Sequence, residues 1–410
     1  MKRRDFIKSS VASSAALATA VVTGGLSGKA QAAASNKAMI QRVTQLGNTD
    51  MKISDISFGA GRLPSASMIL RAIDRGINYF DTAPDYGPSE DYIGKALTRF
   101  KQRDKIYIAS KFCHPIPYSA GTSHLQTSHN KADYIASVEN SLKRMGTDYL
   151  DVVFVHAMGE LADYDAERSR LLHPEMLEAF ESLKKSGKAR YLAVSSHGPH
   201  NMEKLMLEAV RSGHYHVIMP AFNFMKFPKV PELLKEARKK GVGVVAMKTL
   251  AGAKEMPEIT EKGLSFEHSA FKWVLKHPEV AGLVITIKTV KDLDNYVQAS
   301  GQAFAKADQN ILDQYAVRFG NSYCRTGCGD CQGACPSGVD VATILRYQMY
   351  FQDYGDQKQA MLQYAQLNNG ASACDSCDST PCVAACDYGL PVASKLMAAH
   401  RTLSFTNPVV

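Results

Sequence analysis

Short apolar runs alternate with amphipathic stretches along most of the chain. Eight of the apolar runs, after Asp55, have the length and β-branched content of buried strands. Between these runs, apolar residues recur at helical spacing, as in Leu177, Phe180 and Leu183, before the stop Lys184-Lys185-Ser186-Gly187. The predicted strands are Ile56–Gly59, Tyr79–Thr82, Ile106–Ser110, Asp151–Val155, Tyr191–Ser195, Val217–Ala221, Val242–Met247 and Gly282–Ile287.

Eight strand–helix units in about 250 residues predict an α/β fold, a single parallel (β/α)8 TIM barrel. A doubly wound sheet is the alternative, and the lack of a Gly-x-Gly-x-x-Gly motif after an early strand disfavours it. Before the barrel, Val43–Leu46 and Met51–Ile53 flank Gly47-Asn48-Thr49-Asp50, which predicts an N-terminal hairpin. We expect the hairpin and barrel to occupy residues 39–305.

The composition is that of an ordinary globular protein. The chain has 410 residues, of which 45% are hydrophobic and 21% charged. This balance excludes a mainly disordered, collagen-like or coiled-coil chain. The formal net charge is +8, and beyond residue 32 it is spread without basic runs. The charge pattern therefore predicts no nucleic-acid partner.

The first 32 residues have the layout of an export signal. Lys2-Arg3-Arg4-Asp5-Phe6-Ile7-Lys8 precedes the uncharged run Val11–Gly28, and Ala30-Gln31-Ala32 offers small residues for cleavage. The arginine pair resembles a twin-arginine signal, which belongs to a route for folded proteins. The alternative is an uncleaved membrane anchor, which the scarcity of Leu, Ile and Phe disfavours. We expect a periplasmic protein without a membrane span after cleavage.

Ionisable residues follow three neighbouring predicted strands. Asp81 and Tyr86 follow the second, Lys111 the third and His156 the fourth. Taken singly, these residues have structural alternatives. Asp81 would cap a helix, Lys111 would bury its aliphatic chain with its charge in water, and His156 would be a hydrogen-bonded core residue. Together they fall where a parallel barrel carries its active site, at the carboxyl ends of the strands.

These four residue types suit proton transfer to a carbonyl oxygen. Tyr86 would be the acid, and a nearby Lys111 cation is expected to lower the pKa of its phenol. Asp81 would hold Lys111 charged and in place. His156 would orient the substrate carbonyl while Tyr86 protonates its oxygen and hydride arrives at carbon.

The barrel resembles an aldo-keto reductase over roughly residues 40–300. The matching stretches are Leu46-Gly47-Asn48-Thr49, Asp81-Thr82-Ala83 with Tyr86-Gly87, Ser110-Lys111 and Val155-His156. The resemblance implies that Asp81, Tyr86, Lys111 and His156 are the family's catalytic tetrad. It also implies reduction of small aldehydes and ketones, or the reverse, with NADPH extended along the barrel mouth.

The expected nicotinamide site departs from the family pattern. Ser195 and Ser196 stand where the family has a Ser-Asn pair. Met219 stands in place of a Gln, and Met247 in place of the aromatic residue that stacks on the nicotinamide. The resemblance still assigns these four residues to the cofactor.

Two loops at the mouth are candidates for phosphate binding. They contain Lys248-Thr249-Leu250-Ala251-Gly252 and Lys288-Thr289, after the seventh and eighth strands. Lys248 and Lys288 would meet phosphate groups, Lys288 the 2′-phosphate; solvated lysines beside a turn are the alternative. Cys113 and His114 are expected to line the pocket mouth, and Cys113 has no basic partner that would make it reactive.

Eight of the nine cysteines follow residue 320. They form two quartets, Cys324-x3-Cys328-x2-Cys331-x3-Cys335-Pro336 and Cys374-x2-Cys377-x4-Cys382-x3-Cys386, separated by predicted helices over Val341–Gln352 and Gln357–Leu367. Each quartet resembles the bacterial ferredoxin run with one stretched gap. Two zinc sites of four cysteines each, or four disulfides, are the alternatives.

The paired quartets resemble an α-helical ferredoxin module, which we place at residues 310–400. The resemblance implies two [4Fe-4S] clusters with crossed ligands. One would be held by Cys324, Cys328, Cys331 and Cys386, the other by Cys374, Cys377, Cys382 and Cys335.

The sequence therefore predicts an exported oxidoreductase that interconverts a carbonyl and an alcohol with NADP(H) and carries a two-cluster electron-transfer module. The alternative is a periplasmic electron carrier, or a docking partner for another redox enzyme, whose barrel is catalytically idle. Nicotinamide binding would distinguish the two.

Overall fold

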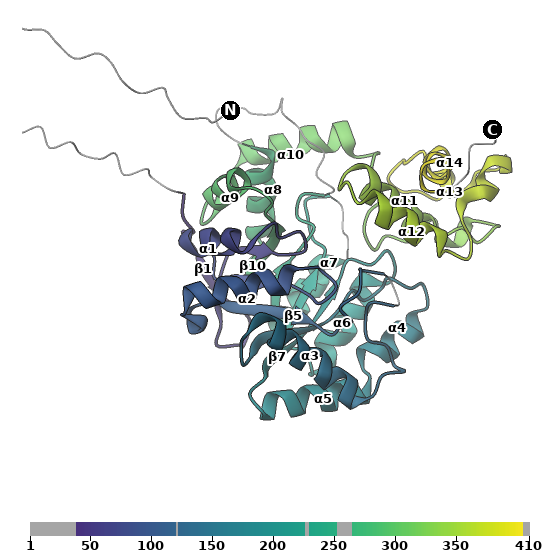
Figure 1. The fold of residues 1–410 in the computed structure, drawn as a ribbon. Helices are drawn as coiled ribbons and strands as arrows, with labels where there is room; N and C mark the ends of the chain where they lie inside the picture. Colours follow the sequence, from purple (N-terminus) through teal and green to yellow (C-terminus); the bar gives the residue numbers. More distant parts are fainter. Residues whose placement is uncertain (1–37, 120–121, 226–228, 252–264, 405–410) are drawn as a thin grey trace, which may run out of the picture. The chain divides into compact units, whose positions relative to one another are not determined.

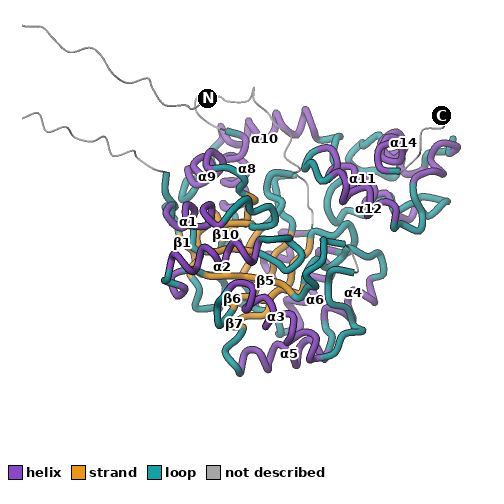
Figure 2. Tube along the Cα trace, viewed as in Figure 1, coloured by secondary structure: helices purple, strands orange, loops and turns teal. Residues whose placement is uncertain are grey.

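The computed structural model of the chain describes residues 38–119, 122–225, 229–251 and 265–404. The predicted export signal and Gly252 lie outside these residues. Eight parallel strands close into a barrel in the order β10-β3-β4-β5-β6-β7-β8-β9, seen as the ring of orange strands in Figure 2. They are β3 (Ile56–Gly59), β4 (Tyr79–Asp81), β5 (Tyr107–Lys111), β6 (Leu150–Val155), β7 (Ala189–Ser196), β8 (Val217–Pro220), β9 (Gly243–Ala246) and β10 (Gly282–Thr286).

The predicted barrel is thus confirmed, with each strand within two residues of its expected limits. The predicted hairpin is confirmed as well, because β1 (Val43–Gln45) pairs antiparallel with β2 (Lys52–Ser54). Its turn needs Gly47, where φ is +53° and a Cβ would lie 2.4 Å from the backbone nitrogen of Gly243.

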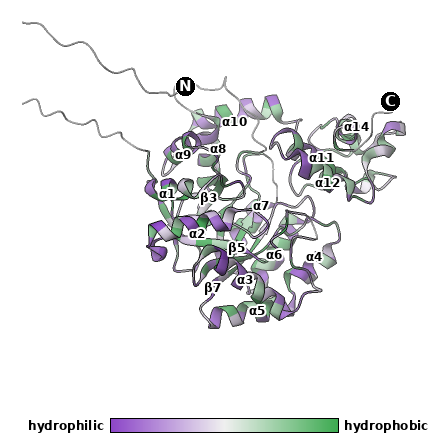
Figure 3. Ribbon diagram, viewed as in Figure 1, coloured by the Kyte–Doolittle hydropathy of each residue, from purple (hydrophilic) through white to green (hydrophobic). Residues whose placement is uncertain are grey.

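Helices surround the barrel and bury one face each on it (Figure 1). They are α1 (Ala66–Asp74), α2 (Ser89–Phe100), α3 (Lys131–Met145), α4 (Tyr164–Leu171), α5 (Pro174–Lys185), α6 (Met202–Ser212), α7 (Val230–Lys240), α8 (Phe266–Leu275) and α9 (Val290–Tyr296), with 3-10 turns at Arg103–Lys105 and Val297–Ala299. Figure 3 shows hydrophobic and hydrophilic residues mixed along α2 and α5, as expected of helices with one buried face. Local signals set the limits of α3, which begins at a capping box of Asn130 and Asp133 and ends at Gly146.

The C-terminal part is helical. It contains α10 (Lys306–Phe319), α11 (Val341–Gln352), α12 (Gln357–Ala365), α13 (Pro381–Ala384) and α14 (Val392–Leu403), with 3-10 turns at Gln332–Ala334 and Ala371–Ser376. Both helices predicted between the cysteine quartets are therefore present, the second ending two residues early. The predicted domain limits, 305 and 310, fall at the start of α10. Tyr315 of α10 stacks on Phe266 of the barrel, with ring centroids 4.3 Å apart.

The segment from Cys331 to Leu403 has its own apolar cluster. Its centre is formed by α11, α12 and α14, with several of the cysteines packed against it. No helix among the described residues has both the length and the apolar character needed to cross a membrane.

Candidate functional site

The strand register brings the four residues predicted as catalytic together. Asp81 ends β4 and pairs with Ala109 of β5, and Lys111 ends β5 beside Phe154 of β6. His156 follows β6 directly. All three side chains are therefore aimed into the same carboxyl end of the barrel.

Lys111 and Asp81 form a buried ion pair. The Nζ of Lys111 donates to Asp81 Oδ1 at 2.5 Å and to the Thr82 carbonyl at 3.0 Å, and both side chains are at most 6% exposed. The same Nζ lies 5.3 Å from the centre of the Tyr86 ring. Tyr86 Oη is 3.4 Å from His156 Nε2. The four side chains thus form one continuous chain of contacts.

The expected effect of Lys111 on Tyr86 is wrong. Burial, with the Asp81 and Asp85 carboxylates, raises the pKa of the Tyr86 phenol well above its ordinary range. Desolvation disfavours phenolate, and the Lys111 ammonium is engaged with Asp81 and the Thr82 carbonyl. The phenol therefore keeps its proton until a substrate accepts it. Burial also lowers the pKa of His156 to about 3, so this imidazole is neutral.

Three residues that have no predicted chemical role lie against His156. Cys113 Sγ is 3.1 Å from His156 Nδ1, and Asp85 Oδ2 is 3.5 Å from the same nitrogen. His124, eleven residues beyond Cys113, reaches the same place with its ring centroid 4.5 Å from that of His156. Cys113 and His124 form an isolated antiparallel bridge in the loop after β5. His114, expected with Cys113 at the mouth, instead contacts His129, with the two Nε2 atoms 3.1 Å apart.

The residues expected at the nicotinamide are engaged with the barrel itself. Ser196 Oγ donates to the Met158 carbonyl at 2.7 Å, and Ser195 Oγ accepts from Ala157 N at 3.1 Å. Met219 is 2% exposed within the barrel interior, where Met247 packs against the same apolar cluster.

The loop after β9 fits an anionic group. Thr249 Oγ1 is buried and has no hydrogen-bond partner, which is unusual for a buried hydroxyl. Lys248 and Ala251 beside it have φ near +56° and +52°, a strained conformation common at binding sites. At β10, Lys288 is exposed, and Thr289 caps α9 by accepting from Asp292 N.

Lys248 lies among groups from both halves of the chain. Its Nζ is 5.2 and 5.1 Å from the ring centres of Tyr350 and Tyr354. Burial, followed by the Arg346 cation, lowers the pKa of Lys248 to about 8; Arg62 also lowers it, and Glu160 and Asp356 oppose the shift. The half-buried Lys248 and the buried Arg346 thus share one small region, which favours an anion between them.

Helix α11 covers the carboxyl ends of the strands with polar contacts. Arg346 Nη1 is 3.0 Å from His197 Nδ1 and 3.6 Å from Glu160 Oε1. Asp340, which caps α11, contacts His200 Nε2 at 3.1 Å. The sequence reasoning assigned no role to α11.

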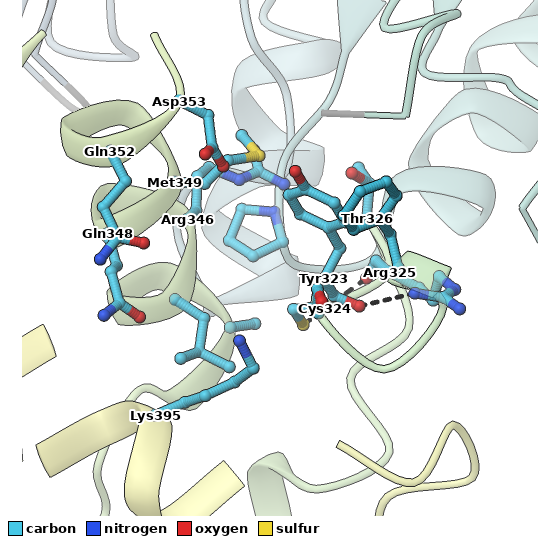
Figure 4. Close-up of a pocket in the computed structure, with 15 residues that line it drawn as sticks. Tyr323, Cys324, Arg325, Thr326, Arg346, Gln348, Met349, Gln352, Asp353 and Lys395 are labelled. Atoms are coloured by element: carbon cyan, nitrogen blue, oxygen red, sulfur yellow. Dashed lines mark hydrogen bonds between the residues drawn. The ribbon is translucent and has the colours of Figure 1, made fainter. Parts of the chain in front are cut away.

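Beside α11 lies a pocket of about 330 Å3. Figure 4 shows Tyr323, Cys324 and Arg325 on one side of it and Gln348 and Gln352 of α11 on the other. A second space is lined by Cys324 together with Lys248 and Ala251 of the loop after β9, so the first cysteine lies beside the barrel mouth.

The cysteines gather in two crossed sets, as the resemblance implied. A small space is lined by Cys324, Cys328, Cys331 and Cys386. The neighbours that raise the pKa of Cys374 include Cys335, Cys382 and Cys377. All eight are free thiols, so this structure does not contain the four disulfides.

The sulfur atoms within these sets are more widely spaced than the ligands of one zinc ion. Thiolates around one tetrahedral zinc lie about 3.8 Å apart, whereas a cubane holds them farther apart. In the described part of the chain, no three of these eight cysteines have their sulfur atoms within 4.8 Å of one another.

Comparisons with known proteins agree with this architecture. Residues 64–255 match the model of the aldo/keto reductase family, and residues 316–387 match a 4Fe-4S dicluster domain. L-galactose dehydrogenase of Arabidopsis thaliana is 30% identical over 261 residues, which cover 59% of this chain and 76% of that protein. L-glyceraldehyde 3-phosphate reductase of Escherichia coli K12 is 26% identical over 333 residues, covering 65% and 91%.

Among solved structures, the holo form of aldo-keto reductase AKR11C1 from Bacillus halodurans aligns with a TM-score of 0.54 and 25% identity, covering 66% of this chain and 95% of that one. The closed barrel, the meeting of Asp81, Tyr86, Lys111 and His156, and these matches agree. The chain belongs to the aldo-keto reductase family, as an oxidoreductase that carries an iron–sulfur module C-terminal to its barrel.

Proposed function

We propose that the barrel interconverts a small carbonyl compound and its alcohol, with Tyr86 as the proton donor. The contact between Tyr86 Oη and His156 Nε2, at 3.4 Å, carries the proposal. A carbonyl oxygen placed between these atoms would accept a hydrogen bond from each. Lys111, which Asp81 holds in place, is the cation that offsets the negative charge that develops on the phenol as its proton leaves.

The test compares two tyrosines beside His156. Tyr86→Phe should lower kcat for carbonyl reduction at least about a hundredfold, because a general acid contributes about 10²–10⁴. Tyr118→Phe is the matched control, since the Tyr118 ring is also near His156, at 5.9 Å, and its hydroxyl has no hydrogen-bond partner. Full turnover in Tyr86→Phe would refute the assignment. Since the two relatives are named for a sugar and a sugar phosphate, hydroxylated aldehydes are the first substrates to screen.

NADP(H) is the proposed nicotinamide cofactor, which supplies or accepts the hydride. Support comes from the family and from the loop that contains Lys248 and the unpartnered Thr249 hydroxyl. Ser195, Ser196, Met219 and Met247 would lie at the nicotinamide. Lys288 would read the 2′-phosphate, with Thr289 beside it.

Lys288→Ala should therefore weaken NADPH more than NADH, by about 1.5–3 kcal/mol, the value of a charge-assisted contact. Lys291→Ala, on an exposed neighbouring lysine, should change neither. Equal weakening of both cofactors would remove Lys288 from phosphate recognition. Absence of any saturable NADPH binding would favour the electron-carrier alternative.

Two [4Fe-4S] clusters in the crossed cysteine sets are the proposed electron carriers, and Arg3-Arg4 the proposed export signal. Clusters are loaded in a reducing compartment, and thiols left empty outside it tend toward disulfides. Export of the folded, loaded protein meets both conditions. Replacing both arginines by lysine should keep brown, loaded protein in the cytoplasm; unchanged periplasmic yield would refute the signal.

A further inference from the structure

Four buried side chains meet beneath the barrel mouth. They are Asp85 from the loop after β4, Cys113 and His124 from the loop after β5, and His156 after β6. Each offers one ligand atom, and these atoms all lie within 4.8 Å of one another. Cys113 and His156 are each 2% exposed, and His124 and Asp85 no more than 5%. The separation is 3.1 Å from Cys113 Sγ to His156 Nδ1 and 3.6 Å from His124 Nε2 to Asp85 Oδ2.

Two atoms of this group lack hydrogen-bond partners. Asp85 Oδ1 and His124 Nε2 are buried and form no hydrogen bond with any described residue, although nearly all buried polar atoms in proteins form one. Among the described residues, the ion-pair partners of Asp85 are His124 and His156, both imidazoles. A buried carboxylate that meets no lysine or arginine is costly unless a cation is bound.

The loop holds its ligands in place before any ion binds. Cys113 and His124 are bridge partners. On either side of them, His114 N donates to the Ser123 carbonyl at 2.8 Å, and Leu125 N to the Phe112 carbonyl at 3.3 Å. Ser123 Oγ lies 3.2 Å from Asp85 Oδ2 and so orients this carboxylate. Supporting contacts of this kind are typical of metal sites.

We propose that Asp85, Cys113, His124 and His156 bind one Zn²⁺ ion. Thiolate and imidazole ligands with one carboxylate suit zinc, whereas Mg²⁺ and Ca²⁺ favour oxygen ligands throughout. Donor atoms around a tetrahedral zinc lie about 3.2–3.8 Å apart, which the distances above approach. This site is separate from the eight cysteines of the C-terminal part.

The zinc would act as a positioning device. Bound to His156 Nδ1, it leaves the proton of that imidazole on Nε2, which faces Tyr86 Oη. The ring would then present a fixed donor to a carbonyl oxygen. This consequence rests on the proposed function, whereas the binding of zinc does not.

The first test uses the full chain, purified with its clusters and without oxygen. Elemental analysis should find about one zinc per chain. Zinc-edge X-ray absorption, which iron does not obscure, should show one sulfur at about 2.3 Å and three nitrogen or oxygen atoms at about 2.0–2.1 Å. An all-sulfur shell would place the zinc among the other cysteines and overturn the proposal. So would the absence of zinc.

Variants then locate the site. Cys113→Ser and Asp85→Asn should each lose the zinc while iron and sulfide stay unchanged; Asp85→Asn keeps the side-chain size in case Cys113→Ser does not fold. His114→Gln, next to Cys113 but paired with His129, should keep the zinc. Zinc retained in both site variants, or a different metal lost from them, would overturn the assignment. Tyr86→Phe should keep the zinc, so the two proposals can fail separately: full turnover by zinc-loaded Tyr86→Phe, or no turnover by the zinc-loaded wild-type protein, would contradict the catalytic proposal alone.

Discussion

A buried ion pair joins α10 to the barrel, and its removal should be costly. Lys272 of α8 pairs with Asp308 of α10, and the two side chains are 4% and 1% exposed. Asp308 also accepts from Ser269 Oγ at 3.0 Å and Ala305 N at 2.8 Å. Lys272→Met leaves these two hydrogen bonds and removes the cation. An uncompensated buried charge costs about 3–5 kcal/mol.

The assay is urea unfolding followed by the fluorescence of Trp273, the one tryptophan of the chain. Trp273 lies on α8 with its ring 5.1 Å from Phe222, so it reports on this part of the barrel. With a slope of about 3 kcal/mol per molar urea, the midpoint should fall by about 1–1.7 M. Lys276→Met, one turn along on the exposed side, should change stability by no more than about 0.5 kcal/mol.

Adding Asp308→Asn to Lys272→Met should restore most of the loss, because a neutral pair leaves no buried charge. Equal midpoints for Lys272→Met and Lys276→Met would refute the reasoning. Failure of the double variant to recover would show that packing of the Lys272 stem, rather than charge, is what Lys272 contributes.

Three further predictions concern the clusters, Lys248 and α2. Cys386→Ser and Cys328→Ser should each lose about half of the iron, because both cysteines are assigned to the same cluster. The double variant should lose no more than either single variant, and additive loss would refute the crossed pairing. Burial lowers the pKa of Lys248 to about 8, so folding penalises its charged form, and the unfolding free energy should rise between pH 8 and the unfolded pKa near 10.5. Lys248→Met should remove this contribution and be more stable at pH 7; equal pH slopes in urea titrations would contradict it. Gly94→Ala should destabilise despite better helix propensity, since its Cβ would lie 2.9 Å from the carbonyl oxygens of Arg144 and Met145; unfolding at or above the wild-type urea midpoint would show that α2 can move.

The strands could be predicted because their signals are local. Each is a short apolar run followed by a helix with its own start and stop, as at Asn130 and Gly146 around α3. The meeting of Asp81, Lys111 and His156 followed from topology, since the carboxyl ends of neighbouring parallel strands share one edge. No long-range packing had to be known for either result.

The group around His156 could not be predicted in the same way. Cys113 was set aside because it had no visible partner, and its partner His124 is eleven residues along a loop without regular structure. The bridge between them depends on how that loop folds back. The histidines and the cysteine that follow Lys111 are the sequence signal for this group. Only the structure shows that His124 belongs to it, whereas His114 and His129 contact each other.

The role of α11 also depends on non-local packing. Its residues Val341 to Gln348 are all buried, including Thr343, Arg346 and Gln348. A helix whose first two turns are buried on all sides must contact several other elements. The sequence pattern of the helix does not show which elements these are. The sequence predicted the helix with its correct limits and left the barrel contacts of Arg346 and Asp340 undiscovered.

The contacts of α11 link the two halves through charged and polar groups. Arg346 is 9% exposed and Glu160 likewise, so their separation would leave charges buried. Apolar contacts alone would tolerate sliding of the helix, whereas Arg346 with His197 and Asp340 with His200 fix its position at two points. The ring of Tyr350 on the same helix lies 5.2 Å from Lys248 Nζ at the barrel mouth, and Cys324 lines the neighbouring pocket. A cluster bound at Cys324 would thus keep a constant relation to the carbonyl site, which electron exchange between them would require.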